Sequence, residues 1–256
     1  MANFYPEDNG NSGGEREYSI TTGTVKENWD KDHPGMIRVE YFLGTKGKNL
    51  TGWIPMMMPY AGKKYGSYAL PEVGDMVVIG FDRGDRNCPI ALGALYSKVN
   101  TIPEKTAVEK NTVKRFLTKG GCSVEFSDVD KKEKIEITTP KKLKILMEDE
   151  KEHIVISDDK GDNGVEIDSK NGTVRLTAAK KLELCVGSDK MVTLDGSSKA
   201  MTLKAGKIDA KADQAVNIKG SNTQISGSML TLKGDSTVKA EASGILQVKG
   251  SMVKIN

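Results

Sequence analysis

The sequence predicts an all-β protein in two parts, a small closed barrel followed by a long ladder of very short strands. Three observations support this prediction. No helical period of useful length occurs, every Trp, Tyr and Phe lies at or before Phe126, and the chain from Asp130 onward repeats one short phrase. In that phrase, two apolar residues flank a single residue and a polar turn follows. The 256 residues are enough for two modest domains.

Four segments follow one another along the chain. Residues 1–16 are polar and rich in Gly and Asn, so we expect a flexible arm. Residues 17–97 contain short alternating runs separated by Gly- and Pro-containing turns, which is typical of a small barrel. Residues 98–119 form a charged connector, and residues 120–256 form the ladder.

Within the barrel segment, Met36–Phe42 alternates most clearly. Ile37, Val39 and Tyr41 share one face of this run, which predicts a half-buried strand. The preceding Asp32-His33-Pro34-Gly35 predicts a tight turn, because Pro fixes φ and Gly allows a positive φ.

Fifteen apolar pairs make up the ladder, and the starts of successive pairs lie 7 to 11 residues apart. The spacing shortens and the apolar residues become smaller toward the C-terminus, so we expect a rod that tapers. The pairs are Ile135/Ile137, Leu143/Ile145, Ile154/Ile156, Val165/Ile167, Val174/Leu176, Leu182/Leu184, Val192/Leu194, Met201/Leu203, Ile208/Ala210, Val216/Ile218, Thr223/Ile225, Leu230/Leu232, Val238/Ala240, Leu246/Val248 and Val253/Ile255.

Such short strands are stable only when repeats stack and cover one another. Two arrangements would achieve this: a solenoid wound from one chain, or three chains wound around a common axis. A single-chain solenoid needs a wide core, whereas each repeat here offers only two modest apolar residues. The thin core favours three chains, and closed cyclic symmetry would leave no open lateral edge.

Charge and cysteine usage exclude few classes of function. The net charge of +3 gives no argument for nucleic-acid binding, although residues 197–256 hold nine Lys against four acidic residues. Cys88, Cys122 and Cys185 form no C-x-x-C pair, so we expect reduced thiols. The N-terminus has no apolar run, which predicts synthesis in the cytoplasm without a signal peptide.

Several short motifs recur in a specific order along residues 18–256. In the barrel they are Gly23-Thr24-Val25, Pro34-Gly35, Ile37-Arg38-Val39, Trp53-Ile54-Pro55 and Leu70-Pro71-Glu72-Val73-Gly74-Asp75. At the start of the ladder they are Thr118-Lys119-Gly120-Gly121, Val124 and Phe126. In this order the chain resembles the central spike of contractile injection machines. That family comprises phage baseplate assembly protein V, VgrG-like spikes of type VI secretion and the spikes of phage-tail-like bacteriocins.

The resemblance implies an N-terminal OB-fold barrel, a C-terminal intertwined three-stranded β-helix and a homotrimer. It implies a structural spike that sheath contraction drives through the target cell envelope, in a phage tail, a bacteriocin or a secretion apparatus. VgrG proteins carry a hub domain before the barrel, so a separate hub protein is expected here. Family members can carry His after the needle-entry Gly, where this chain has Cys122, and some phage spikes end in an iron-binding His-x-His motif that is absent here.

Two partner contacts are predicted from these departures and from exposed apolar residues. Met252, Val253, Ile255 and Asn256 would contact a small, PAAR-like tip protein, because an apolar blunt end usually marks a partner site. Met56, Met57 and Met58 would either pack under the barrel or contact the hub, since Met adapts to irregular surfaces.

We expect no catalytic residue, no metal site and no cofactor. His33 and His153 are the only histidines, and neither belongs to a His/Cys cluster of metal-binding spacing. No Ser lies in a G-x-S-x-G motif, and Asp158/Asp159 read as solvated turn charges.

Two other functions remain as alternatives to the spike. The first is a single-chain β-solenoid that binds or cleaves carbohydrate. The second is an OB-fold nucleic-acid binder with a stalk, for which Trp53, Tyr60, Tyr65 and Tyr68 lie beside Lys46, Lys48, Lys63 and Lys64. We expect these aromatic residues to pack in the core and against the hub, and we expect no nucleic-acid partner.

Overall fold

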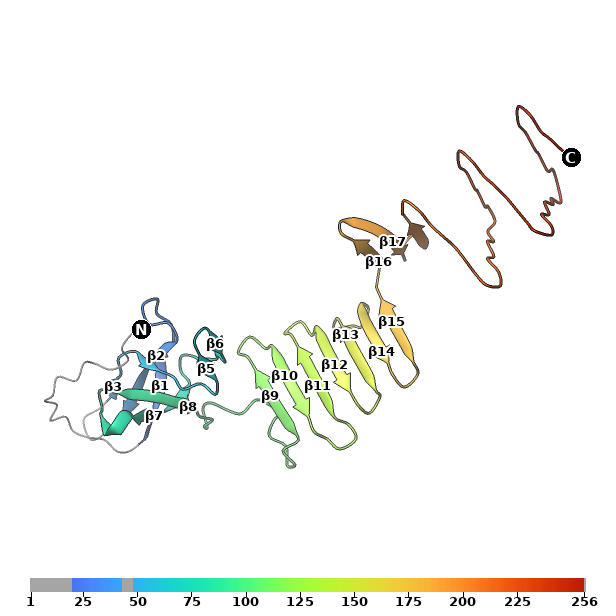
Figure 1. The fold of residues 1–256 in the computed structure, drawn as a ribbon. Helices are drawn as coiled ribbons and strands as arrows, with labels where there is room; N and C mark the ends of the chain where they lie inside the picture. Colours follow the sequence, from blue (N-terminus) through green and yellow to red (C-terminus); the bar gives the residue numbers. More distant parts are fainter. Residues whose placement is uncertain (1–19, 43–47, 256) are drawn as a thin grey trace. The chain divides into compact units, whose positions relative to one another are not determined.

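The computed structural model describes residues 20–42 and 48–255 and is all-β within these ranges, apart from one 3₁₀ turn at Asp82–Gly84 (Figure 1). The arm predicted at residues 1–16 lies outside the described residues. By its internal contacts the chain divides into two units, Met1–Leu182 with Asp195–Lys199 and Glu183–Leu194 with Ala200–Asn256. No helix in the described part of the chain is long and apolar enough to cross a membrane.

The first part of the chain forms a small closed barrel. Its sheet runs in the order β3-β2-β1-β7-β8, and β4 pairs with β2. A parallel bridge from Met56 to Ala91 then joins the segment after β4 to β8, so the circuit β2-β1-β7-β8-β4 closes, as predicted. The strands are β1 (Thr21–Glu27), β2 (Met36–Phe42), β3 (Lys48–Leu50), β4 (Ile54–Pro55), β7 (Met76–Phe81) and β8 (Pro89–Ala94), with a hairpin of β5 (Ala61–Gly62) and β6 (Tyr65–Gly66).

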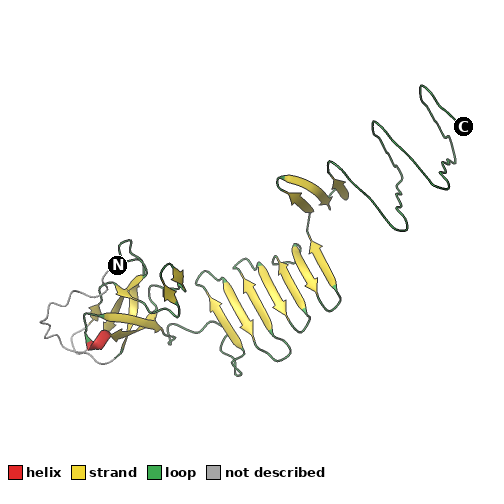
Figure 2. Cartoon of the chain, viewed as in Figure 1, coloured by secondary structure: helices red, strands yellow, loops and turns green. Residues whose placement is uncertain are grey.

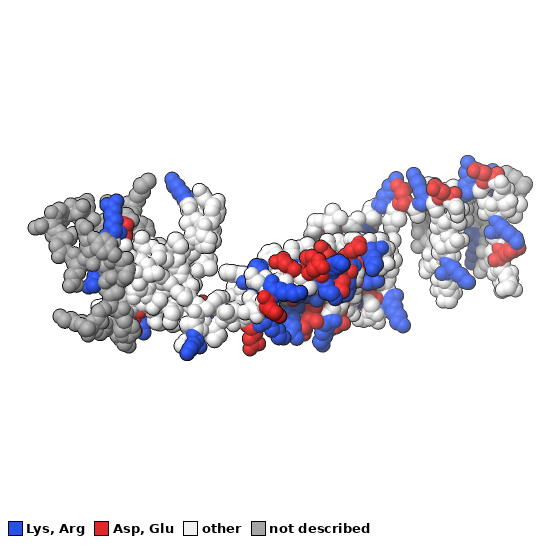
Figure 3. Space-filling model, turned by 90° about the horizontal axis from the view of Figure 1, so that it is seen from below, with Lys and Arg blue, Asp and Glu red and all other residues white. Residues whose placement is uncertain are grey.

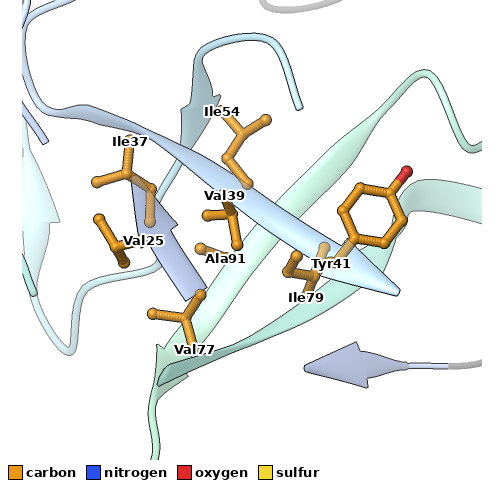
Figure 4. Close-up of a cluster of buried hydrophobic side chains, with 8 residues drawn as sticks. All are labelled: Val25, Ile37, Val39, Tyr41, Ile54, Val77, Ile79 and Ala91. Carbon is orange, nitrogen blue, oxygen red and sulfur yellow. The ribbon is translucent and has the colours of Figure 1, made fainter. Parts of the chain in front are cut away.

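The inward-facing residues of these strands make the barrel core (Figure 4). The predicted face of β2 is confirmed, since Ile37, Val39 and Tyr41 are all buried. Thr51 is also buried, and its Oγ1 accepts a hydrogen bond from the Val39 backbone N–H at 2.9 Å. The core residues are Val25, Ile37, Val39, Tyr41, Ile54, Val77, Ile79 and Ala91.

The next part of the chain forms a seven-stranded antiparallel sheet in which every strand pairs with its neighbour in sequence. The strands are β9 (Val113–Leu117), β10 (Ser123–Ser127), β11 (Lys134–Thr138), β12 (Lys144–Glu148), β13 (His153–Ser157), β14 (Gly164–Asp168) and β15 (Thr173–Thr177). They are five residues long, so they are longer than the three-residue phrase of the ladder.

Two local features differ from the sequence expectation. The segment expected as a plain connector contains β9, which pairs with β10. The predicted pair Leu143/Ile145 is shifted by two residues, because Leu143 closes a turn in which its N–H donates to Thr139 Oγ1 at 3.2 Å. Ile145 and Met147 are therefore the apolar pair of β12.

The last part of the chain contains a three-stranded sheet and then a tail. The sheet consists of β16 (Lys181–Val186), β17 (Asp189–Asp195) and β18 (Ala200–Leu203), in that order. No strand occurs between residues 204 and 255, and every residue in that span is exposed (Figure 2). The seven apolar pairs predicted beyond Leu203 therefore form no strand within one chain.

Candidate assembly surface

One face of the seven-stranded sheet is apolar at every strand position except Lys114 on β9. Cross-strand register aligns the apolar residues of successive strands into two parallel rows, because the side chains of paired residues point to the same side. The first row is Phe116, Val124, Ile137, Ile145, Ile156, Val165 and Leu176. The second row is Phe126, Ile135, Met147, Ile154, Ile167 and Val174. We call these thirteen residues the apolar face.

The apolar face is open in the single chain. Eleven of its thirteen residues keep at least 36% of their surface exposed, up to 70% at Val174. Full burial of a large aliphatic or aromatic side chain contributes about 1.5–3 kcal/mol, so covering these half-exposed groups would contribute on the order of 10 kcal/mol per chain. Contiguous apolar surface of this size marks a site of association.

The opposite face of the same sheet is mainly polar and pairs its own charges, although Val113, Leu117, Val155 and the buried Leu146 also lie on it. Arg115 Nε donates to Glu125 Oε2 at 2.8 Å, and Lys134 Nζ lies 3.5 Å from Glu125 Oε1. At the other end of this face, Arg175 pairs with Glu166. Figure 3 shows Lys, Arg, Asp and Glu crowded over this part of the chain. The polar face therefore suits solvent, and only the apolar face lacks a cover.

The environment of Glu125 changes its acidity. Partial burial raises the pKa of this carboxyl, but the hydrogen bond and charge of Arg115, together with the charge of Lys134, outweigh burial and lower the pKa below its usual value. Glu125 is therefore ionised under ordinary conditions and holds two cations on the polar face.

The tail, residues 204–255, also exposes apolar side chains, although it forms no strands. Its apolar residues alternate with polar ones, yet Ile218 is 73% exposed, Leu232 is 71% exposed and Val248 is 71% exposed. A strand needs a partner for its backbone hydrogen bonds, and the single chain offers none here. The tail is thus a second segment whose sequence predicts β-structure that one chain does not complete.

Comparison with known proteins identifies the family. The barrel, over residues 21–96, matches the family model described as the type VI secretion system/phage-baseplate injector OB domain. The barrel thus carries the OB domain of this family, and the relatives to which the chain is similar are type VI secretion spike proteins. The predicted OB fold of the barrel is thereby confirmed.

The spike family relatives are long proteins that this chain matches in part. The chain is 34% identical over 88 residues to the type VI secretion system spike protein VgrG5 of Pseudomonas aeruginosa, covering 33% of this chain and 11% of that protein. It is 27% identical over 147 residues to VgrG1b of the same organism, covering 54% of this chain and 20% of that protein. It is 32% identical over 102 residues to the actin cross-linking toxin VgrG1 of Vibrio cholerae, covering 38% of this chain and 9% of that protein. The chain thus spans about a tenth to a fifth of the length of these relatives.

Among the predicted contact residues, the three methionines occupy different environments. Met56 packs against the barrel core, and Met58 is half-buried. Met57 is 57% exposed, so it alone of the three leaves most of its side chain open to solvent. Sequence patterns cannot separate these three residues, because a run of three identical residues has no period.

The predicted tip residues are exposed where the structure describes them. Met252 is 77% exposed, Val253 52% and Ile255 92%, whereas Asn256 lies outside the described residues. No alternation of buried and exposed residues distinguishes these positions from the rest of the tail.

The barrel also carries aromatic residues on its surface. Trp53 is half-buried and stacks on His33, with the ring centroids 5.6 Å apart. Tyr60, Tyr65 and Tyr68 are exposed, by 61% to 73%. The expected core packing therefore applies only in part to Trp53 and not to the three tyrosines.

The two histidines and the other metal-binding residue types do not form a metal-binding group in the described part of the chain. Over residues 20–42 and 48–255, no three His, Cys, Asp or Glu side chains are grouped so that they could hold a metal ion. His33 bonds to Asp30 at 2.8 Å, and His153 lies 3.5 Å from Asp168 on the polar face.

Proposed function

We propose that this protein is a non-enzymatic, homotrimeric spike at the centre of a contractile baseplate, driven through the target envelope when the sheath contracts. The family supplies the spike role, and the sheet supplies a mechanical reason for the trimer. Three apolar faces turned toward a common axis would cover one another, while the three polar faces remained in water.

The open apolar face is the observation that carries this proposal. A monomer with this face in solvent would forgo burial on the order of 10 kcal/mol per chain. Three tails would similarly supply the strand partners that one tail lacks, forming the predicted intertwined β-helix. Continuous hydrogen bonding between chains would give the rod the stiffness that piercing requires.

Two further partners complete the proposal. The barrel would dock on a separate hub protein through Met57, and a small PAAR-like protein would cap Met252, Val253 and Ile255. Both contacts rest on exposed apolar side chains at the positions that the sequence singles out.

Light scattering of the full-length chain tests the proposal directly. A homotrimer gives three times the 27.8 kDa mass of one chain, whereas a mass near 27.8 kDa would refute it. The hub contact is tested by co-purification of the hub protein with Met57→Asp. Val73→Asp is the matched control, because Val73 is also on the barrel and is 56% exposed. Equal hub recovery from both variants would exclude Met57 from the contact.

A further inference from the structure

The turns of the seven-stranded sheet lie in two rows, one along each side, because successive turns of an antiparallel meander alternate between sides (Figure 1). One row, which we call the basic row, consists of residues 118–122, 139–143, 158–163 and 178–180. The other, the acidic row, consists of residues 128–133, 149–152 and 169–172.

The two rows carry opposite net charge. The basic row contains five Lys and three Asp, a net charge of +2. The acidic row contains six carboxylates and four Lys, a net charge of −2. Opposite net charge on the two sides of one sheet is the pattern required for electrostatic complementarity between copies.

Ion pairs within the chain do not cancel the difference in net charge between the two rows. In the acidic row, Lys132 pairs with Glu150 at 2.6 Å, and Lys151 pairs with Glu148 at 2.9 Å. Among the described residues, four carboxylates of that row and two of its lysines then have no ion pair. These are Asp130, Glu133, Asp149 and Glu152, with Lys131 and Lys170.

The basic row shows the converse. Lys142 pairs with Asp159 at 3.2 Å, and Asp158 accepts a 2.6 Å hydrogen bond from Asn163 Nδ2. Three of its lysines, Lys141, Lys160 and Lys180, have no ion pair within the described ranges, against two such carboxylates, Asp158 and Asp162. The charges left over on the two sides are therefore mainly of opposite sign.

The polar face next to the basic row is hollowed. An open hollow of about 550 Å³ extends over β11 to β15 beside the turn 158–163. The charges that line it are mixed, with three lysines, Lys142, Lys144 and Lys160, and four carboxylates, Glu136, Asp158, Asp159 and Glu166. A Cβ at Gly164 would come within 2.6 Å of the Ile156 carbonyl oxygen, so the glycine also permits the close backbone approach there.

Because the turns alternate between the two sides of the sheet, the turns of one row are offset from those of the other along the direction in which the strands stack. Each acidic-row turn lies midway, along the sheet, between two basic-row turns. With strands about 4.8 Å apart, the turns on one side repeat about every 9.6 Å, which leaves space for one turn of a neighbour between them. Rotation about an axis along the sheet brings the acidic row of one copy against the basic row of the next.

We propose that the acidic row of one copy docks against the basic row of the next copy around the axis. In this arrangement the turn 149–152 lies between the neighbour's turns 139–143 and 158–163, so that Asp149 and Glu152 meet Lys141 and Lys160. The proposal rests on the homotrimer of the proposed function and adds what fixes the order and register of its chains. The apolar faces supply the association, and the two rows exclude misaligned neighbours.

Charge reversal with compensation tests this pairing in the full-length chain. One variant is Asp149→Lys with Glu152→Lys, and a second is Lys141→Glu with Lys160→Glu. A third combines all four changes. The control is Glu104→Lys with Glu109→Lys, which changes the charge by the same amount at exposed positions outside both rows. Each protein is refolded from denaturant, and the trimer yield is measured by light scattering in 50 mM and 500 mM NaCl.

The expected result is a trimer yield at least about tenfold lower for each single-row variant in 50 mM NaCl, because rows of like charge then face each other. The combined variant and the control should stay within about twofold of the unchanged protein. In 500 mM NaCl, where the Debye length is about 4 Å, most of the loss should disappear.

Undiminished trimer from both single-row variants would overturn the pairing while leaving the trimer intact. Failure of the combined variant to recover would also overturn it, since the rows would then not face each other. A monomeric unchanged protein would instead refute the proposed function, and the pairing with it.

Discussion

Placing a carboxylate on the apolar face distinguishes a covered face from an open one. Ile156 lies in the middle of that face on β13 and is 49% exposed in the single chain. If the face were open in solution, Ile156→Asp would be an ordinary surface change, within about 0.5 kcal/mol of neutral. If three copies cover it, each copy brings a carboxylate to the axis.

The cost in the covered case is large. About half of an isoleucine burial, roughly 1 kcal/mol, is lost from each chain. Burying an unpaired carboxylate costs several kcal/mol per ion, and three like charges meet near one axis. The total is about 10 kcal/mol or more per trimer, so we expect no trimer at micromolar protein.

Light scattering with circular dichroism gives the answer. We expect Ile156→Asp to have the mass of one chain, 27.8 kDa, with the barrel still folded. Thr177→Asp is the control, because it adds the same charge to an exposed position on the polar face. A trimer of Ile156→Asp as stable as that of Thr177→Asp would refute the argument that the apolar face is the association surface.

Three further predictions concern stability and are measured by denaturant unfolding. Gly23→Ala should destabilise the barrel by about 1–3 kcal/mol, because the added Cβ would lie 2.5 Å from Val39 Cγ1. Its control, Gly93→Ala, should leave the free energy of unfolding nearly unchanged, because the space around Gly93 is open. Lys131→Gly should stabilise the chain by about 1 kcal/mol, because Lys131 has a φ of 60°, whereas Lys170→Gly in the same row of turns should not. Folding lowers the pKa of Glu125, so the ionised carboxylate contributes its full stabilisation above the unfolded pKa near 4.5, and this stabilisation is lost as the pH falls through the lower folded pKa. The Glu125→Gln variant should therefore lose less unfolding free energy between pH 7 and pH 3 than the unchanged protein. An equal loss in both proteins would contradict this.

The alternation of apolar residues predicted most of the strands, because period-two patterning responds directly to a sheet with one apolar face. Ile154/Ile156 and Val165/Ile167 lie together on that face, as their pattern indicates. The pattern failed at Leu143, where a side chain from Thr139 holds the residue in a turn. It also missed β9, because that edge strand has only Phe116 on the apolar face and Lys114 at the other position.

The apolar face was harder to predict from the sequence than the strands were. The repeats indicated that the chain needs partners, but not which face they cover, since register between strands is a long-range property. The difference between Met56 and Met57 likewise depends on one bridge to Ala91, which brings Met56 to the core. Neither fact follows from composition or period.

The meander order of the seven-stranded sheet has a consequence for how the protein forms. Every strand there pairs with the next in sequence, so its contacts close short loops and can form quickly within one chain. The tail beyond Leu203 has no such local partner, so in the proposed trimer its strands would form only after encounter with other chains, a step whose rate depends on protein concentration. Folding would then proceed from the meander toward the C-terminus, with the prefolded sheets aligning three chains before their tails wind together.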